Sequence, residues 1–310
     1  MSDINGDERD SPLLTADAGA ITKVMERIAA AEKKVGWESG HRVDLDGLQW
    51  VPAAVSKDLK TLLHITLSGS LAKYARRRLL QARAQGFRIR VALTTESLFS
   101  EEIILTLAEV DADVYVIDDR VRKWQTKSRH VMAALADLQI PVTILARKQV
   151  GTVAWGNISS GTKQERGRRL EAFLAFLLSQ VSDLRVVERN YRNASQEIDL
   201  VLQVDSLSNR VWQKSGTPLL LVEAKNTAAR ATQQMVSVLI QKLQTKRTST
   251  RIGFLVSPNG FTADAKLEEL RSSRSEVCVV MIDGGDVLAL IGAEDLDECL
   301  EGLVRHALLR

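Results

Sequence analysis

Two short stretches of this sequence place acidic and basic side chains where they can share one site. The first, Glu197-Ile198-Asp199, opens an apolar run, and the second, Glu223-Ala224-Lys225, closes another. Side chains two apart on a strand share a face, so Glu223 and Lys225 point the same way and a hairpin can bring Asp199 beside them. Two carboxylates can hold a hard divalent cation such as Mg²⁺. A neighbouring lysine can orient or deprotonate an attacking water and balance negative charge.

Charged residues at a strand end also occur on ordinary solvated sheet faces. Here, however, residues 219–222 before Glu223 form a continuous apolar run, which indicates a buried strand. Burying two acids and a lysine at its end is costly unless they pair or bind a metal. A helix predicted over residues 167–180 adds another acid, Glu171, at the polar edge of its apolar pattern. These features favour a functional site.

The same residues resemble the PD-(D/E)xK nuclease superfamily, also called restriction-endonuclease-like, and more narrowly the Mrr-like restriction endonuclease catalytic domain. The resemblance extends from about residue 161 to residue 303 and implies an αβββαβ core. The segments that carry it are 167–171, 197–201, 221–226, 253–257, 259–262 and 282–284.

This resemblance implies a role for each residue of the motif. Asp199 and Glu223 would ligate Mg²⁺, with Mn²⁺ as a substitute, and the backbone carbonyl of Ala224 would add a ligand. Lys225 would position the nucleophilic water, and Glu171 would assist from the helix. The proline of the family's name is absent, because Glu197-Ile198 stands before Asp199. Glu197 is either a further ligand or a surface acid.

Composition bounds the class of protein. The chain has 310 residues, enough for two domains, and its 45% hydrophobic and 26% charged content is typical of soluble globular proteins. It contains no apolar run of the ~20 residues that a membrane span needs, and its polar, acidic start does not resemble a secretory signal. Two distant cysteines and four scattered histidines give neither a disulfide framework nor a zinc site. We therefore expect a cytoplasmic protein without a membrane partner.

The charge distribution says more than the net charge of +3. Basic residues gather on both sides of the candidate site in sequence, over residues 163–192 and 242–251. They can contact phosphates or form ordinary solvated helix faces. By contrast, an acidic amphipathic helix is predicted near the C-terminus, where it would pack on the domain edge away from DNA. Its acids are Glu294, Asp295, Asp297, Glu298 and Glu301.

The order of predicted elements gives an α/β fold with two domains. Residues 1–54 comprise a tail, a helix over 20–34 and an irregular segment with a short strand pair. Residues 55–147 alternate strands and helices, which predicts a Rossmann-like parallel sheet that serves as a sensor or targeting domain. Residues 148–162 are predicted to be a Gly/Ser-containing linker, and residues 163–310 the nuclease domain. The expected strands of the Rossmann-like domain are 62–67, 88–93, 113–117 and 142–145.

One loop of the Rossmann-like domain is a candidate ligand site. Ser68-Gly69-Ser70 links the first parallel strand to a helix N-terminus, where amides and hydroxyls can meet an anion. A nucleotide or another activating ligand fits this position. An ordinary tight turn is the alternative, since the loop carries neither a dinucleotide-binding fingerprint nor a P-loop.

The function that these features favour is hydrolysis of DNA phosphodiester bonds by a Mg²⁺-dependent endonuclease, in restriction or phage defence. The family resemblance implies 3′-hydroxyl and 5′-phosphate products. A homodimer is the natural way to cut both strands of a duplex with one site each. Two alternatives stay open at this stage: a DNA repair or recombination nuclease, and a non-catalytic nucleic-acid-binding regulatory protein with a nuclease-like fold. The sequence does not distinguish DNA from RNA.

Overall fold

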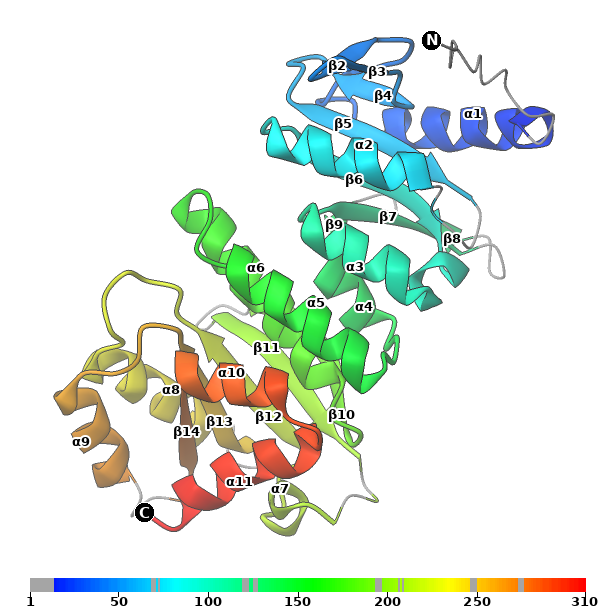
Figure 1. Cartoon of the computed structure of the whole chain (residues 1–310). Helices are drawn as coiled ribbons and strands as arrows, with labels where there is room; N and C mark the ends of the chain where they lie inside the picture. Colours follow the sequence, from blue (N-terminus) through cyan, green and yellow to red (C-terminus); the bar gives the residue numbers. More distant parts are fainter. Residues whose placement is uncertain are drawn as a thin grey trace, which may run out of the picture. The chain divides into compact units, whose positions relative to one another are not determined.

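The structure is a computed structural model of the chain, and it divides into two compact units (Figure 1). The first comprises Met1–Thr106 and Ala112–Arg129, and the second comprises Leu107–Asp111 and His130–Arg310. The structure describes residues 14–67, 71, 73–118, 123–124, 128–192, 197–205, 207, 209–245, 250–272 and 276–310.

The N-terminal unit is built on a sheet in the order β1-β4-β5-β6-β7-β8. Strands β5, β6 and β7 are parallel, while β1, β4 and β8 add antiparallel neighbours at its two sides. The parallel strands predicted at 62–67, 88–93 and 113–117 are confirmed. The elements are α1 (Leu14–Ala31), β1 (Trp37–Glu38), β2 (Val43–Leu45), β3 (Leu48–Trp50), β4 (Ala54–Ser56), β5 (Thr61–Thr66), α2 (Lys73–Ala84), β6 (Arg88–Thr94), η1 (Glu96–Phe99), α3 (Glu101–Glu109), β7 (Asp113–Asp118) and β8 (Lys123–Trp124).

Local sequence explains this unit. Most residues of the central strands β5 and β6 are buried, as expected for strands covered on both faces, although Thr, His and Arg residues interrupt their apolar pattern. Helix α1 packs Val24 and Ile28 into a core with Tyr115. The antiparallel pair β2–β3 supplies the strand pair expected between residues 37 and 55. Helix α2 ends at Ala84, and Gly86 follows two residues later with a φ of 88°, a conformation that suits glycine just after a helix C-terminus.

The C-terminal unit is built on a five-stranded sheet in the order β10-β11-β12-β13-β14. Strands β10, β11 and β12 run antiparallel, and β12, β13 and β14 run parallel. The order α6-β10-β11-β12-α8-β13 is the predicted αβββαβ core. The elements are α4 (Val131–Asp137), α5 (Ile144–Asn157), α6 (Lys163–Ser179), β10 (Leu184–Arg192), β11 (Glu197–Val204), α7 (Val211–Lys214), β12 (Leu219–Ala224), α8 (Gln233–Thr245), β13 (Thr250–Ser257), α9 (Ala263–Ser272), β14 (Cys278–Asp283), α10 (Gly284–Gly292) and α11 (Leu296–Leu308); the two-residue strand β9 (Arg129–His130) precedes them.

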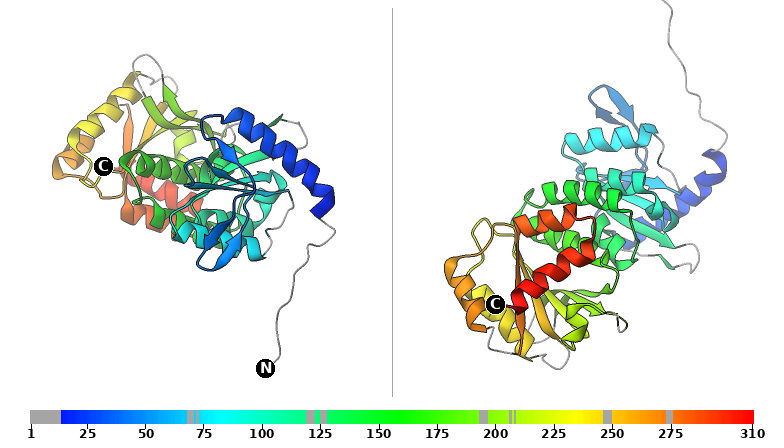
Figure 2. Two further views of the ribbon diagram at one scale, coloured as in Figure 1. Left: turned by 90° about the horizontal axis from the view of Figure 1, so that it is seen from above. Right: turned by 60° about the horizontal axis from the view of Figure 1, so that its bottom comes forward.

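Helices cover both faces of this second sheet (Figure 2). Helices α8 and α9 pack an apolar cluster, which includes Leu239, Ala265 and Leu255 of β13, against one face. Helix α6 lies on the other face, and its buried residues include Leu170, Phe173 and Leu177. A capping box between Thr162 and Glu165 starts α6 four residues earlier than the sequence predicts. The sheet and α6 are therefore the frame on which the candidate site is held.

The fourth Rossmann strand predicted at 142–145 and the linker predicted at 148–162 are both wrong. Most of these residues form α5, which Thr143 caps by accepting a hydrogen bond of 3.2 Å from the Ala146 N–H. A short apolar run does not distinguish a strand from a buried helix segment. Gly151 does not mark a flexible segment, because a Cβ there would lie 3.2 Å from Ile291 Cγ2. Glycine at this position allows close packing between α5 and α10, and α5 belongs to the C-terminal unit.

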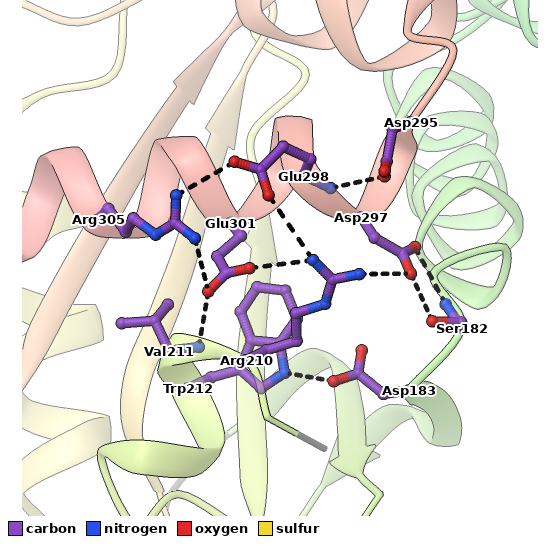
Figure 3. Close-up of polar contacts among 10 residues, drawn as sticks. All are labelled: Ser182, Asp183, Arg210, Val211, Trp212, Asp295, Asp297, Glu298, Glu301 and Arg305. Atoms are coloured by element: carbon purple, nitrogen blue, oxygen red, sulfur yellow. Dashed lines mark hydrogen bonds and ion pairs between the residues drawn. The ribbon is translucent and has the colours of Figure 1, made fainter.

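The acidic C-terminal helix α11 packs against edge strand β14, as the sequence predicts, and its acids gather around Arg210 (Figure 3). The Arg210 guanidinium donates hydrogen bonds to Asp297 at 3.1 Å and to Glu301 at 3.0 Å. Arg305 reaches Glu298 at 3.1 Å and Glu301 at 3.2 Å from the other side. These five side chains, called here the Arg210 cluster, fix α11 to the turn before α7.

Candidate active site

Strands β11 and β12 bring the two predicted metal ligands together. Their antiparallel register pairs Leu200 with Val222, so Asp199 and Glu223 come next to each other where the ladder stops. Both acids are nearly inaccessible, with Asp199 8% exposed and Glu223 4% exposed. The apolar run before Glu223 is buried as expected. The carboxylate pair therefore lies in a covered position where the β11–β12 ladder stops.

Lys225 lies against both carboxylates. Its Nζ is 3.0 Å from Glu223 Oε2 and 3.7 Å from Asp199 Oδ2. The backbone N–H of Ala224, between Glu223 and Lys225, donates to Asp199 Oδ2 at 2.7 Å. Glu223 and Lys225, two residues apart, therefore point to the same side of the strand, as the sequence predicts.

Sequence reasoning missed a second lysine, Lys242 of α8. Its Nζ donates hydrogen bonds to Glu223 Oε1 and to the backbone carbonyl of Glu197. The sequence placed Lys242 in a basic segment that could contact phosphates. A signal was present, because Lys242 adjoins the buried Leu243 on the apolar stripe of α8, but the sequence does not show which way that stripe faces. Asp199, Glu223, Lys225 and Lys242 are called here the Glu223 cluster.

Burial and neighbouring charges shift the pKa values in this cluster. Burial raises the pKa of Asp199, and the charge of Glu223 raises it further, against the opposing effects of Lys225 and the Ala224 N–H. Burial acts to lower the pKa of Lys225, but the charges of Asp199 and Glu223 outweigh it and leave the pKa raised. The cluster is therefore a carboxylate pair under electrostatic stress, compensated by ammonium groups.

Glu171 of α6 belongs to the same electrostatic group. Burial and then the charge of Asp199 raise the pKa of Glu171 to about 7, although a hydrogen bond from Asn190 and the charge of Lys225 act in the opposite direction. Asn226, directly after Lys225, fastens α6 nearby by donating to the carbonyl oxygens of Ile158 at 2.7 Å and Arg166 at 2.9 Å. The predicted assisting acid thus lies within electrostatic reach of the carboxylate pair.

Glu197, the other candidate ligand, is paired outside the Glu223 cluster. The Glu197 side chain pairs with Arg192, with Glu197 Oε1 at 2.6 Å from Arg192 Nη2, and is about half exposed. This geometry favours its interpretation as a surface acid. Ser68-Gly69-Ser70, the candidate ligand loop, lies outside the described residues.

The donor set fits a hard divalent cation. Asp199 and Glu223 are carboxylates, and burial together with their mutual repulsion raises the pKa of Asp199, so a cation between them would relieve that repulsion. Within the described ranges, no group of three or more His, Cys, Asp or Glu side chains lies close enough to hold a metal. Mg²⁺ commonly uses one or two protein carboxylates and keeps several waters, so two carboxylates suffice.

Comparison with known proteins agrees with this geometry. Residues 162–291 match the family model Mrr_cat, whose description is restriction endonuclease. The C-terminal half of the chain contains a restriction-endonuclease-like domain. This domain holds the whole Glu223 cluster and Glu171, and its αβββαβ order is the one that the sequence resemblance implied.

The remaining comparisons add little. No curated protein matches the chain. A crystal structure of protein VC1899 from Vibrio cholerae aligns at 12% identity over 93% of this chain and 90% of that chain, with a TM-score of 0.28, too low to support an inference. None of the described helices is long and apolar enough to cross a membrane.

Proposed function

We propose that this protein is a Mg²⁺-dependent endonuclease that hydrolyses DNA phosphodiester bonds, and that it acts in restriction or phage defence. The observation that carries the proposal is the buried pair Asp199 and Glu223 with Lys225 against both, inside a restriction-endonuclease-like domain. Structural ion pairs also perturb pKa values, but a raised carboxylate pKa is the sign expected where a site is kept ready for a cation.

Asp199, Glu223 and Lys225 each have a role in this proposal. Asp199 and Glu223 would hold Mg²⁺ (or Mn²⁺), with the Ala224 carbonyl oxygen as a further donor. When bound, the metal would activate a water and neutralise charge that builds on the phosphate. The raised pKa keeps Lys225 protonated in the metal-free site. Lys225 therefore suits orientation of the water and stabilisation of the phosphate charge better than acceptance of a proton.

The structure separates basic residues that can meet DNA from those already engaged. Arg169 donates to both carboxylate oxygens of Asp111, and Arg189 donates to both oxygens of Asp137. Lys163 and Arg168, in contrast, are exposed on α6, the helix that carries Glu171. We assign phosphate contact to Lys163 and Arg168, whose loss should weaken binding at all sequences and reduce its salt dependence.

A cleavage assay tests the proposal directly. Purified full-length protein is incubated with supercoiled plasmid and with modified and unmodified linear DNA, in Mg²⁺, Mn²⁺, Ca²⁺ or EDTA. Cleavage is expected with Mg²⁺ and Mn²⁺ and not with EDTA. Lys225→Met should abolish it, while Lys266→Met, the same substitution at an exposed site on α9, should not. Cleavage that survives EDTA, or equal activity of the two variants, would contradict the proposal.

The DNA products of plasmid cleavage test how many copies of the protein act together. We propose that two copies act together, since one site per copy is enough to cut both strands of a duplex. Direct conversion of supercoiled plasmid to linear DNA, with a rate that rises more steeply than protein concentration, is the expected pattern. Accumulation of nicked circles at every concentration would indicate a monomeric enzyme.

A further inference from the structure

Lys242 reaches the candidate site from a different element than Lys225 does, and it is more deeply covered. It extends from α8, and its side chain is 11% exposed, against 30% for Lys225. The two lysines divide the carboxylate of Glu223 between them, with Lys225 on Oε2 and Lys242 on Oε1. Both oxygens of this proposed ligand are therefore occupied by ammonium groups.

Lys242 also joins the two strands that carry the acids. The β11–β12 ladder stops at Leu200 and Val222, and beyond it the carbonyl of Glu197 accepts a hydrogen bond from Lys242 instead of from a strand partner on β12. One ammonium thus ties the start of β11 to the end of β12. An uncharged side chain of the same length would leave the Glu223 Oε1 atom buried without this donor.

The contact between Lys242 and Glu223 affects how the site can bind a cation. Two carboxylates and two ammonium groups compensate one another in the metal-free cluster. A divalent cation that joins Asp199 and Glu223 needs a share of the Glu223 oxygens, both of which already accept from lysines. Lys225 is held by Asp199 as well as by Glu223. Among the described carboxylates Lys242 contacts only Glu223, and its other partner is the neutral carbonyl of Glu197. Lys242 therefore has the weaker electrostatic attraction to the carboxylate pair and is the ammonium that a cation would displace first.

We infer that Lys242 is a positioning residue that holds Glu223 against β11 in the metal-free protein and competes with the divalent cation for Glu223 Oε1. The inference rests on the proposed function, because competition requires a metal at Asp199 and Glu223. It predicts that Lys242 stabilises the metal-free site and, for the same reason, weakens metal binding.

Calcium titration in the absence of DNA separates these effects. The proteins are full-length wild type, Lys242→Gln, Lys242→Met and the control Lys266→Gln, whose lysine is exposed on α9. Glutamine keeps a donor without the charge, and methionine removes both. The Ca²⁺ dissociation constant, measured by calorimetry, should fall about fivefold in Lys242→Gln because a like charge leaves the metal's neighbourhood. The melting temperature in EDTA should fall for both Lys242 variants and stay unchanged in the control.

The outcomes distinguish failure of the inference about Lys242 from failure of the proposed function. A purely structural Lys242 would lower the melting temperature and leave the Ca²⁺ dissociation constant within twofold of wild type, which would overturn the inference alone. Wild-type protein that binds neither Ca²⁺ nor Mg²⁺ would overturn the proposed function, and the inference with it.

A second measurement needs no variant and so remains decisive if Lys242 substitutions prevent folding. Wild-type protein is labelled briefly with an amine-reactive acetylating reagent, with and without saturating Ca²⁺, and modification is quantified by mass spectrometry. Lys242 should be protected in EDTA and label several times faster with Ca²⁺, while exposed Lys266 labels equally in both. Equal labelling of Lys242 under conditions where Ca²⁺ is bound would show that the metal does not displace it.

Discussion

The Glu223 cluster and the Arg210 cluster both lie in the C-terminal unit and both pair acids with basic side chains, but they are assembled differently. In the Arg210 cluster three acids of a single helix, α11, meet two guanidiniums. Arg210, before α7, hydrogen-bonds two of these acids, and Arg305 of the same helix contacts two. In the Glu223 cluster two acids from neighbouring strands are opposed by two lysines from separate elements. A guanidinium binds carboxylates through a rigid fork, whereas an ammonium is a compact charge that can be moved.

Among the acids of the two clusters, Glu301 and Asp199 have pKa shifts of opposite sign. Burial acts to raise the pKa of Glu301, but hydrogen bonds from Arg210 and the Val211 N–H outweigh it and leave the pKa lowered. In the Glu223 cluster, burial and the carboxylate partner raise the pKa of Asp199 despite two nearby lysines. The Arg210 cluster thus favours the charged form of Glu301, whereas the Glu223 cluster disfavours the charged form of Asp199. Charged residues that gain stability from their neighbours are structural, and those left under stress are candidates for binding a cation.

Asp199→Asn gives the largest expected effect. Asparagine can still accept the hydrogen bond from the Ala224 N–H but cannot supply a carboxylate to a metal. Plasmid cleavage in Mg²⁺ should fall by about a thousandfold or more, since metal and charge stabilisation dominate such catalysis. The melting temperature in EDTA should be unchanged or higher, because repulsion with Glu223 is relieved. Asp264→Asn, at an exposed position of α9, serves as the control and should cleave normally. Normal cleavage by Asp199→Asn would remove Asp199 from the site.

Arg210→Met should have the opposite profile. It leaves Asp297 and Glu301 covered and without their main cation, and we expect unfolding to become easier by about 2–3 kcal/mol, discounted for partial exposure of the guanidinium. Arg305→Met, which touches the same acids but is 49% exposed against 28% for Arg210, should cost less than about 1 kcal/mol. Urea unfolding measures both. Folded Arg210→Met should cleave DNA at the wild-type rate, and a specific loss of cleavage would show that the two clusters are coupled.

A divalent cation should stabilise the folded protein through the Glu223 cluster and not through the Arg210 cluster. Ca²⁺ at about ten times its dissociation constant should stabilise wild type by about 1.4 kcal/mol, because it binds only the folded site. Arg305→Met should gain the same amount, and Asp199→Asn should gain little or nothing. Ca²⁺ should support binding without efficient cleavage. Calorimetry in EDTA and in Ca²⁺ gives these differences, and an equal gain in Asp199→Asn would place the cation elsewhere.

The sequence predicts one cluster well and not the other, for a physical reason. Asp199, Glu223 and Lys225 follow from strand alternation and from an apolar run that ends in charge, which are local features. Lys242 and Arg210 depend on which way a helix or a turn faces in three dimensions. Arg210 precedes α7 and meets α11 more than eighty residues later in the chain. No spacing rule connects such positions.

The misassigned segment has a related cause. Residues 142–162 contain a short apolar stretch followed by glycines, a pattern that also fits a strand and a linker. The packing of Gly151 on Ile291 and of Trp155 on Phe173, with ring centroids 5.6 Å apart, decides for a helix. The αβββαβ core, in contrast, is carried by long and strongly patterned elements. Local patterns therefore predicted the scaffold and its acids, whereas tertiary contacts fixed the domain boundary and the second lysine.

Replacing one acid near each cluster by glutamine gives the smallest effects and tests the sign difference directly. For Glu171 the pKa is raised to about 7, so ionisation disfavours the folded state. In EDTA, Glu171→Gln should gain stability relative to wild type as pH rises from about 4.5 to 7, the window between its unfolded and folded pKa values. Given its partial exposure, the gain should be on the order of 1 kcal/mol.

For Glu301 the pKa is lowered, so the ionised form stabilises the folded state above its unfolded pKa. Glu301→Gln should therefore be less stable than wild type by about 1 kcal/mol at pH 7, as expected for a lost charge-assisted hydrogen bond. That deficit should shrink as pH falls below about 4.5, where Glu301 of the unfolded chain takes up a proton before the folded form, with its lower pKa, does. Urea unfolding at a series of pH values between 3.5 and 8 measures both variants against wild type. If relative stability fell with rising pH for both variants, both acids would be held by structural partners, and the distinction between the clusters would fail.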